Sequence, residues 1–489
     1  MQSNAQLTKF NKIYDYGFSA GRSIFNSETG YYMIGANAGD NLNHPYLSIW
    51  KFDTIGNILW NKLYGDTLYR SIDAAENACK RVKNGYAIAG TCLPTEYEPE
   101  KWIQLYRFNN EFDTLWTKKL LNDTVEIFAR DLVYCSDGGF AIVGFYKRDE
   151  ATGEILPQYT GKGLLLRTDS MGNYLWHKTY GEWDYGNELY KVVQTPDGGF
   201  LCGGATKSYS GSHNWDWYLV KTDSLGNKEW HRTYGNSAQD DSRIAGITIT
   251  RDTNYIITGG RAANSESFRP YIKVLDKNFN SIITKVLPYQ SIGAYVGQTI
   301  ELKDGSFIMK GSNRANPAGI TIVNMTKFDE DFNTLWRRQY TAYDTTNVDN
   351  YMSSIDTCSD GGFVLGGWAA VYDGNGQRLS LIKTDSLGCD GTDWWDCSTS
   401  IMIKEYANSD NFKLYPNPAN SFVVIEGSYF DRLSNCKVES VVISDLTGKE
   451  IKSIHFYESQ NNIRINIEDF KSGIYLVKIG DRIEKLIIN

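Results

Sequence analysis

Short apolar runs with alternating polar positions recur along most of the chain, and a tight-turn signal precedes each of them. The clearest signals pair Asp or Asn with Gly and then an aromatic residue; they lie at 84–86, 137–140, 197–200, 304–307 and 360–363, with weaker copies at 29–31 and 253–255. Asp-Gly and Asn-Gly supply the positive φ angles that tight hairpins require. The pattern therefore predicts seven two-stranded hairpins.

A second motif follows each hairpin, in which an Asp or Asn precedes a large apolar residue by seven positions. The pairs are Asp53/Trp60, Asn109/Trp116, Asp169/Trp176, Asp223/Trp230, Asp276/Ile283 and Asp329/Trp336. The Asp-containing segment is typical of a turn between two further strands, one of which carries the Trp. Each repeat thus predicts four antiparallel strands, with a period of about 50 to 60 residues that is typical of propeller blades.

The last repeat lacks a Trp-bearing fourth strand, and a segment at the N-terminus resembles the missing piece. Lys9–Gly17 is similar to the fourth-strand segment that ends in Thr233, Tyr234 and Gly235. We therefore expect an all-β fold in which residues 1–398 form a seven-bladed β-propeller of four-stranded blades, closed by the N-terminal strand. Six blades, eight blades and an open β-solenoid are the alternatives.

Charge and hydropathy limit the kinds of partner that the protein can bind. The 489 residues carry a net charge of −8, which argues against a nucleic acid or anionic membrane bound by bulk charge, and no apolar run approaches the length of a transmembrane segment. The eight cysteines form no CxxC pair. Cys389 and Cys397 are the best disulfide candidates, whereas Cys135 and Cys358 occupy one repeat position and are expected in the core.

Variable loops on one face of the expected ring are the natural place for a ligand. Aromatic and polar groups gather there, and the binding candidates are Tyr146, Tyr159, Tyr209, His213, Trp215 and Trp217. This composition suits a glycan or a surface protein, so the expected role is binding or adhesion. A passive structural surface protein is an alternative.

Four carboxylates occupy one equivalent position just before the first strand of their repeats, namely Asp73, Glu126, Asp241 and Asp349. Near the mouth of a central channel they would form either a cation site, with calcium as the option, or an acidic funnel for a basic ligand. The favoured interpretation is that each carboxylate caps its own turn through backbone N–H groups.

The sequence contains few signals of a catalytic site. There are five histidines and no HExxH, GxSxG, Walker or GxGxxG motif in a fitting context. We assign no catalytic residue, and no cofactor apart from the calcium option. A secreted hydrolase or lyase that degrades polysaccharides remains the alternative function, because acidic pairs exist but their separation is not readable.

From about residue 411 the repeat gives way to another β pattern, which predicts a small Ig-like β-sandwich over 411–489 behind a linker at 399–410. Four motifs stand in order: a Tyr-Pro-Asn-Pro-Ala box at 415–419, a turn at 443–449, a strand at 472–478 and a terminal strand at 485–489. Together they closely resemble the type A C-terminal sorting domain of type IX secretion cargo from Bacteroidota. The residues that carry this signal are Tyr415, Pro416, Asn417, Pro418, Gly448, Gly473, Tyr475 and Lys485.

This resemblance implies that the type IX secretion machinery is a partner and that the chain ends outside the cell or on its outer surface. It also implies a leader, which the present N-terminus does not show; we expect that the chain represents a mature or truncated form. The repeats at 1–398 resemble Asp-Gly-Gly-Phe repeat regions of secreted proteins from the same bacteria, and that resemblance implies no particular activity.

Overall fold

The computed structural model describes most of the chain as β-strands and turns. The described residues are 9–15, 18–39, 46–64, 72–92, 100–123, 125–148, 160–182, 185–209, 214–235, 241, 243–262, 268–287, 295–314, 321–341, 348–371, 376–391, 413–426, 439–445, 449–456, 462–479 and 482–488. The chain divides into two compact units, Met1–Ile401 and Met402–Asn489. Within the described ranges no helix is long and apolar enough to cross a membrane.

The first unit repeats one four-stranded antiparallel sheet. In chain order the sheets are β2(Phe18–Ser27), β3(Gly30–Gly39), β4(Tyr46–Phe52), β5(Ile58–Tyr64); β6(Ile72–Val82), β7(Gly85–Cys92), β8(Lys101–Phe108), β9(Thr114–Asp123); β10(Ile127–Tyr134), β11(Phe140–Tyr146), β12(Lys162–Thr168), β13(Tyr174–Tyr180); β14(Asn187–Gln194), β15(Phe200–Thr206), β16(Asp216–Thr222), β17(Lys228–Tyr234); β18(Ile244–Ile249), β19(Tyr255–Ala262), β20(Phe268–Leu275), β21(Ser281–Val286); β22(Tyr295–Glu301), β23(Phe307–Arg314), β24(Thr321–Phe328), β25(Thr334–Tyr340); and β26(Val348–Thr357), β27(Phe363–Val371), β28(Gly376–Thr384) with β1(Phe10–Tyr14).

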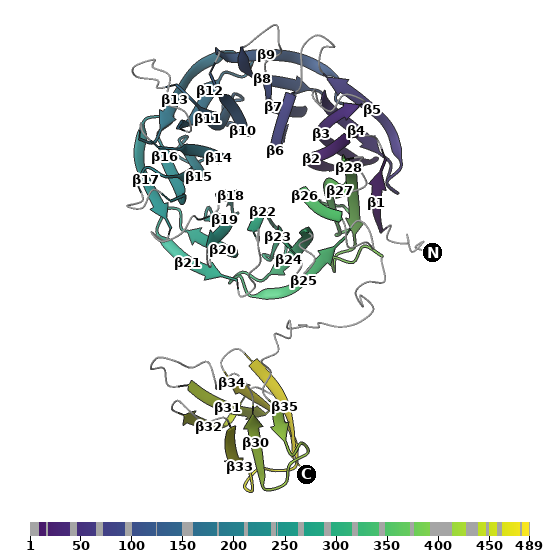
Figure 1. Cartoon of the computed structure of the whole chain (residues 1–489), viewed down its shortest axis with the longest axis vertical. Coiled ribbons are helices and arrows are strands. Elements are labelled where there is room, and N and C mark those ends of the chain that lie inside the picture. Colours follow the sequence, from purple (N-terminus) through teal and green to yellow (C-terminus); the bar gives the residue numbers. More distant parts are fainter. Residues whose placement is uncertain are drawn as a thin grey trace. The chain divides into compact units, whose positions relative to one another are not determined.

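These sheets follow one another around a ring, an arrangement consistent with a propeller (Figure 1). β2, β6, β10, β14, β18, β22 and β26 each form one end of their sheet and lie toward the ring's centre; we call them the inner strands. A tight turn joins each inner strand to the second strand, and it has the Asp-Gly sequence after β10, β14, β22 and β26. The second motif joins the third strand to the fourth.

The second motif is a local turn held by one carboxylate. Asp223 Oδ1 accepts the N–H groups of Leu225 and Asn227, at 2.9 and 2.8 Å, and its Oδ2 accepts the Asn227 side-chain amide at 2.8 Å. These hydrogen bonds lower the pKa of Asp223. Such side-chain-to-backbone bonds make the turn a self-contained unit.

The Asp of the Asp-Gly-Gly turn has a partner that the motif alone does not reveal. A cation just before the end of the third strand reaches it: Lys221 Nζ lies 2.8 Å from Asp197 Oδ2, and Lys383 Nζ lies 2.7 Å from Asp360 Oδ2. Lys221 is 0% exposed, so its charge requires this neighbour. The turn and the third strand are therefore joined by an ion pair.

The N-terminal strand β1 is the fourth strand of the sheet that contains β26–β28. It pairs antiparallel with β28, from Phe10 opposite Lys383 to Tyr14 opposite Leu379. Its side chains also contact the turn of the β2–β5 sheet: a Cβ on Gly56 would lie 2.7 Å from the Phe10 ring. In other sheets the Trp of the fourth strand makes this contact with the next sheet, as Trp176 does with Gly226.

Six of the cysteines lie in the part of the chain that the structure describes. Cys79, Cys92, Cys135, Cys202 and Cys358 are thiols that form no disulfide. Cys135 is buried, as expected, and its repeat equivalent Cys358 is half-buried. Cys389 is disulfide-bonded. The predicted partner, Cys397, lies outside the described residues.

The second unit consists of two small sheets. One holds β29(Lys413–Tyr415), β30(Phe422–Glu426) and β33(Asn462–Asn466); the other holds β32(Glu450–Phe456), β31(Glu439–Asp445), β34(Gly473–Ile479) and β35(Arg482–Ile488). Alternate apolar residues of both sheets, such as Val423, Ile465, Val441 and Val477, share one buried core. The two sheets thus enclose a core that belongs to this unit alone.

Candidate functional site

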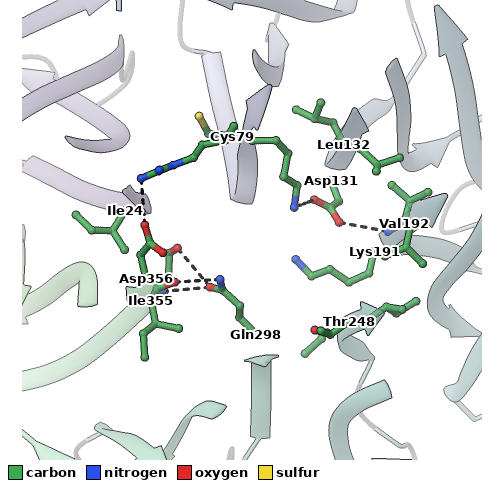
Figure 2. Close-up of a pocket in the computed structure, with 18 of the residues that line it drawn as sticks. Ile24, Cys79, Asp131, Leu132, Lys191, Val192, Thr248, Gln298, Ile355 and Asp356 are labelled. Atoms are coloured by element: carbon green, nitrogen blue, oxygen red, sulfur yellow. Dashed lines mark hydrogen bonds and ion pairs between the residues drawn. The ribbon is translucent and has the colours of Figure 1, made fainter. Parts of the chain in front are cut away.

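The inner strands enclose a cavity at the centre of the first unit. Its volume is about 340 Å³, and residues from every inner strand line it (Figure 2). Each of these strands has a β-bulge where it pairs with its neighbour, for example between Ala129 and Asp131 and between Leu189 and Lys191. A bulge turns the following side chains relative to the regular pleat. Asp131 and Lys191, directly after their bulges, line the cavity.

One side of the cavity carries a buried ion pair. Lys80 Nζ of β6 lies 2.8 Å from Asp131 Oδ1 of β10, and the Asp131 side chain is only 3% exposed. The second oxygen, Oδ2, accepts the Val192 N–H of β14 at 3.2 Å. Asp131 therefore connects three neighbouring inner strands while its charge is neutralised.

Another charged cluster joins β26, β2 and β6. Asp356 Oδ2 accepts the Asn26 N–H at 2.9 Å and lies 3.4 Å from Arg81 Nη2. Arg81 also donates to the Asn26 carbonyl. Burial raises the pKa of Asp356, although the Asn26 N–H and Arg81 oppose the shift. Figure 2 shows Asp356 on the other side of the cavity from Asp131.

Neutral groups complete the lining. Gln298 of β22 clamps the backbone of Ile355: its Oε1 accepts the Ile355 N–H at 3.1 Å and its Nε2 donates to the Ile355 carbonyl at 3.0 Å. Thr248 of β18 donates its hydroxyl to the Thr299 carbonyl at 3.0 Å.

Lys191 extends into the cavity from β14 (Figure 2). The cavity thus offers charged groups of both signs between apolar walls.

Sequence reasoning missed this cavity, yet a signal for it exists. Asp131, Lys191, Gln298 and Ser354 each lie six positions before the Asp of an Asp-Gly turn, and all four line the cavity. A polar residue repeated at one position of an otherwise half-apolar strand indicates a shared polar surface. Aligning the repeats on the turn and then reading backward would have found it.

The aromatic candidates are separated by their burial. Trp217 is 1% exposed and donates its Nε1–H to the Gly260 carbonyl at 3.1 Å, and Tyr146 is 5% exposed and donates its hydroxyl to Asp123 at 2.7 Å. Both rings are core residues, because their apolar faces are covered by neighbouring strands, and we no longer assign them to a ligand surface.

Two other aromatic candidates are less buried. Tyr209 stacks on His231 with ring centroids 4.2 Å apart. Lys207 Nζ lies 5.1 Å from the ring centroid of Trp215, within cation–π range. Tyr159 and His213 lie outside the described residues. Tyr209 and Trp215 remain candidates for the loop face.

The structure describes the side chains of three of the four carboxylates proposed for a cation, Glu126, Asp241 and Asp349. Asp349 is buried, and its Oδ1 accepts the Thr321 N–H. Asp241 is also buried, and its backbone N–H donates to the Trp215 carbonyl at 2.6 Å. Glu126 is exposed. Asp73 lies in β6, and its side chain is outside the described part.

The described residues contain no group of three or more His, Cys, Asp or Glu side chains that could hold a metal ion. The Asp349 contact is the kind that the capping interpretation expects. Calcium therefore stays a hypothesis for experiment.

The described residues among those predicted to carry the sorting signal lie in and beside strands of the second unit. Asn417 grips β35 with both ends of its amide: Nδ2 donates to the Lys485 carbonyl at 2.7 Å, and Oδ1 accepts the Ile487 N–H at 2.8 Å. Tyr475 is 9% exposed and donates its hydroxyl to the Lys471 carbonyl at 2.8 Å. The box therefore fastens the terminal strand.

The flanking box residues Tyr415, Pro416 and Pro418 are exposed, Gly473 begins β34, and Gly448 lies outside the described residues. The Asn417 contact explains why the box and the terminal strand occur together: one amide satisfies two backbone groups that would otherwise face water at the sheet edge.

Comparison with known protein families finds a match for the second unit. Residues 413–489 match the family of secretion system C-terminal sorting domains. The match supports the hypothesis that the chain is cargo of the type IX secretion system, and a tail of this kind implies secretion to the cell surface or the extracellular space.

No curated protein sequence matches the chain. Among solved structures, Sqt1 from Chaetomium thermophilum is similar over 76% of this chain and 86% of its own, with 9% identity and a TM-score of 0.40. An α-L-arabinanase from Penicillium chrysogenum, complexed with arabinobiose, is similar over 78% and 98%, with 13% identity and a TM-score of 0.41. The α-L-arabinofuranosidase Arb93A from Fusarium graminearum is similar over 66% and 97%, with 10% identity and a TM-score of 0.40. Likenesses at this level carry no argument about this chain.

Proposed function

We propose that the protein is a secreted or cell-surface binding protein, exported by the type IX pathway, whose ligand is a glycan or a protein. In this proposal the first unit is a seven-bladed β-propeller that β1 closes, and the second unit is its export address. The observation that carries the binding role is the central cavity, where charged groups from several inner strands converge. Convergent polar groups within a concave apolar lining are typical of ligand sites.

The pairing of the charges favours binding over catalysis. Asp131 is held by Lys80 Nζ at one oxygen and by the Val192 N–H at the other, so both carboxylate oxygens already have a protein contact. Gln298 is likewise committed to the Ile355 backbone. A site whose polar groups are already satisfied is rigid, and rigidity lowers the entropic cost of recognition.

The test is a glycan array and a polysaccharide pull-down with the full chain, run with calcium and with a chelator. We expect one class of glycan to be retained without cleavage. Retention that disappears with the chelator would establish the calcium option at the same time. Absence of retention on every glycan would contradict the glycan-binding role.

A polysaccharide hydrolase is the second candidate, and one observation favours it. The pKa of Asp356 is raised by burial, whereas Asp131 is paired with Lys80 in the same cavity. Two carboxylates in contrasting environments are what an acid and an ionised partner require. Cleavage of a retained glycan that stops in Asp356→Asn, while retention persists, would establish the hydrolase.

A further inference from the structure

Two neighbouring inner strands carry a polar side chain at the extra position of a β-bulge. The pairing of β10 with β11 skips Arg130, between Ala129 and Asp131, and the pairing of β14 with β15 skips Tyr190 at the equivalent position. A bulge directs such a side chain away from the regular pleat. Both side chains are half-buried, and each directly precedes a residue that lines the central cavity. They therefore lie at the edge of that cavity.

Three charged groups surround the Tyr190 ring, and they come from β10, from β14 and from the residue directly before β18, three successive sheets of the ring (Figure 1). The guanidinium carbons of Arg243 and Arg130 lie 4.7 and 5.4 Å from the ring centroid, within cation–π range. The Tyr190 hydroxyl donates to Glu188 Oε2, and this oxygen lies 3.6 Å from Arg130 Nη2. Two guanidinium groups and one carboxylate thus meet around one ring.

The Tyr190 hydroxyl stays protonated in this environment. Burial raises the pKa of Tyr190 and the Glu188 carboxylate raises it further, whereas Arg243 and Arg130 oppose the shift without cancelling it. The ring therefore adds no charge, and the charge around it is that of two cations and one anion.

Both guanidinium groups keep donors for a ligand. Arg130 Nη2 faces Glu188, but Arg130 Nε is buried and has no hydrogen-bond partner. Arg243 is exposed and forms no ion pair with any residue that the structure describes. Asp131, the residue after Arg130, is paired with Lys80. Guanidinium N–H groups form paired hydrogen bonds with oxyanions, so an anionic ligand group would use donors that the protein leaves unused.

The Glu188 carboxylate indicates what accompanies that anion. An acidic peptide would present carboxylates without neighbouring hydroxyl groups, and Glu188 would repel them. A sugar with an anionic substituent carries hydroxyl groups beside it, and an ionised carboxylate accepts hydrogen bonds from such hydroxyl groups. The combination of two guanidinium groups with one carboxylate therefore favours an acidic sugar over an acidic peptide.

We infer that Arg130 and Arg243 bind an anionic group of an acidic glycan, a carboxylate or a sulfate ester, while Glu188 accepts a hydroxyl group of the same sugar. This inference rests on the proposed binding function and names the class of glycan. Charge-assisted hydrogen bonds are about twice as strong as neutral ones, so the anionic group supplies both affinity and discrimination against neutral glycans.

The experiment is affinity electrophoresis of the full chain in native gels that contain dextran, carboxymethyl dextran or dextran sulfate, three polymers with one glucan backbone. At least one anionic polymer should retard the chain, at least tenfold more strongly than dextran, and the two anionic arms tell a carboxylate from a sulfate ester. Arg243→Gln should weaken this retardation by about tenfold. Arg243→Lys keeps the charge without the planar fork and should fall between the two. Thermal unfolding reports whether each variant folds.

Arg251→Gln is the matched control, because Arg251 follows the other end of β18 and removes the same charge from an exposed position that does not line the cavity. Its retardation should equal that of the wild type. Equal losses in Arg243→Gln and Arg251→Gln, equal retardation by dextran and the anionic polymers, or no retardation by either anionic polymer would each overturn the inference. A chain that retains neutral glycans on the array but ignores both anionic dextrans keeps the proposed function and loses only this inference.

Discussion

Two neighbouring sheets of the first unit, β14–β17 and β18–β21, have the same strand order but fill the space between sheets differently. Both place a residue with positive φ in the turn between the third and fourth strands. In the first sheet it is Gly226, at φ 80°, and in the second it is Phe279, at φ 64°. The same backbone thus occurs once with no side chain and once with a large ring.

The neighbouring residues explain the difference. A Cβ on Gly226 would lie 2.6 Å from the ring of Trp176, which belongs to the preceding sheet and packs edge-on against Phe200 at 6.4 Å. Phe279 instead stacks on Tyr255 of its own sheet at 4.9 Å. One position between sheets is therefore filled either by the neighbour's Trp or by the turn's own Phe.

The other sheets use one solution or the other. Gly56, Gly172 and Gly388 receive a ring from the preceding fourth strand, whereas Phe112 and Phe332 stack on rings of their own sheets. The comparison shows that Gly in this turn does more than permit positive φ, because a second residue type has that conformation in other sheets. Gly also makes room for the neighbouring sheet.

The largest effect on stability should come from a side chain added at Gly226. Gly226→Ala combines backbone strain of about 1 kcal/mol with overlap on the Trp176 ring of about 2 kcal/mol, so the free energy of unfolding should fall by about 3 kcal/mol. Gly305→Ala is the matched control: its φ is 83° and a Cβ there meets nothing within 4 Å, so it should cost only about 1 kcal/mol. Urea unfolding of both variants measures the difference.

Equal costs for the two substitutions would show that conformation alone selects Gly226. The comparison between the two sheets would then lose its packing argument, because the Trp176 ring would have moved aside without loss.

Removal of the Phe279 ring from the β18–β21 sheet should lower the free energy of unfolding by a smaller amount. Phe279→Gly removes stacking on Tyr255 and contact with Trp230, at about 3 kcal/mol, and returns about 1 kcal/mol of left-handed strain. The net decrease should be about 2 kcal/mol by urea unfolding. Lys277→Ala, at an exposed position of the same turn, should change stability by less than about 0.5 kcal/mol. A neutral or stabilising Phe279→Gly would mean that strain outweighs packing.

The sequence predicted the parts of this architecture that depend on local chemistry. Turn residues such as Asp223 act within five positions, and the strands between them alternate regularly, so hairpins and the repeat were readable. The resemblance of Lys9–Gly17 to a fourth strand located β1, because its apolar side chains must contact the same kind of turn as every other fourth strand.

What the sequence did not reveal depends on residues from different sheets. Whether Phe279 has room is decided by Trp230, 49 positions earlier along the chain. The direction of Asp131 depends on a bulge, and its ionic partner Lys80 belongs to another sheet. The sequence placed Trp217 among the aromatic and polar residues of a variable loop, but Trp217 lies in the core. Neighbouring positions where a loop meets a strand can have opposite burial, and the sequence did not show on which side Trp217 falls.

The two sheets also differ in one ion pair. In β14–β17, Lys221 contacts Asp197 at 2.8 Å and Glu229 at 3.0 Å. In β18–β21 the position equivalent to Lys221 is Val274, which is buried with Ile256 and Ile272, and the turn lacks the Asp-Gly-Gly sequence. The cation is thus absent from β18–β21, whereas a carboxylate, Asp252, remains at the position equivalent to Asp197 and is exposed to solvent.

The smallest effect should be a pH dependence confined to the sheet with the ion pair. Burial raises the pKa of Asp197, but hydrogen bonds from Lys221, Thr195 and the Gly199 N–H outweigh it and lower the pKa from 3.8 to about 2. Because the folded pKa is below the unfolded one, the pair contributes stability above pH 3.8 that is lost as pH falls toward 2. Asp197 is 56% exposed, so the slope should be shallow.

Thermal unfolding of the wild type and of Asp197→Asn between pH 5 and pH 2 measures this slope. The variant should begin less stable at pH 5 and converge on the wild type toward pH 2, because both then carry a neutral side chain at 197. Asp252→Asn, in the corresponding turn of β18–β21, should run parallel to the wild type, since Val274 offers it no cation. A constant gap between wild type and Asp197→Asn across this range would contradict the prediction, because a carboxylate whose pKa is lowered by its partners must lose that stabilisation as it is protonated.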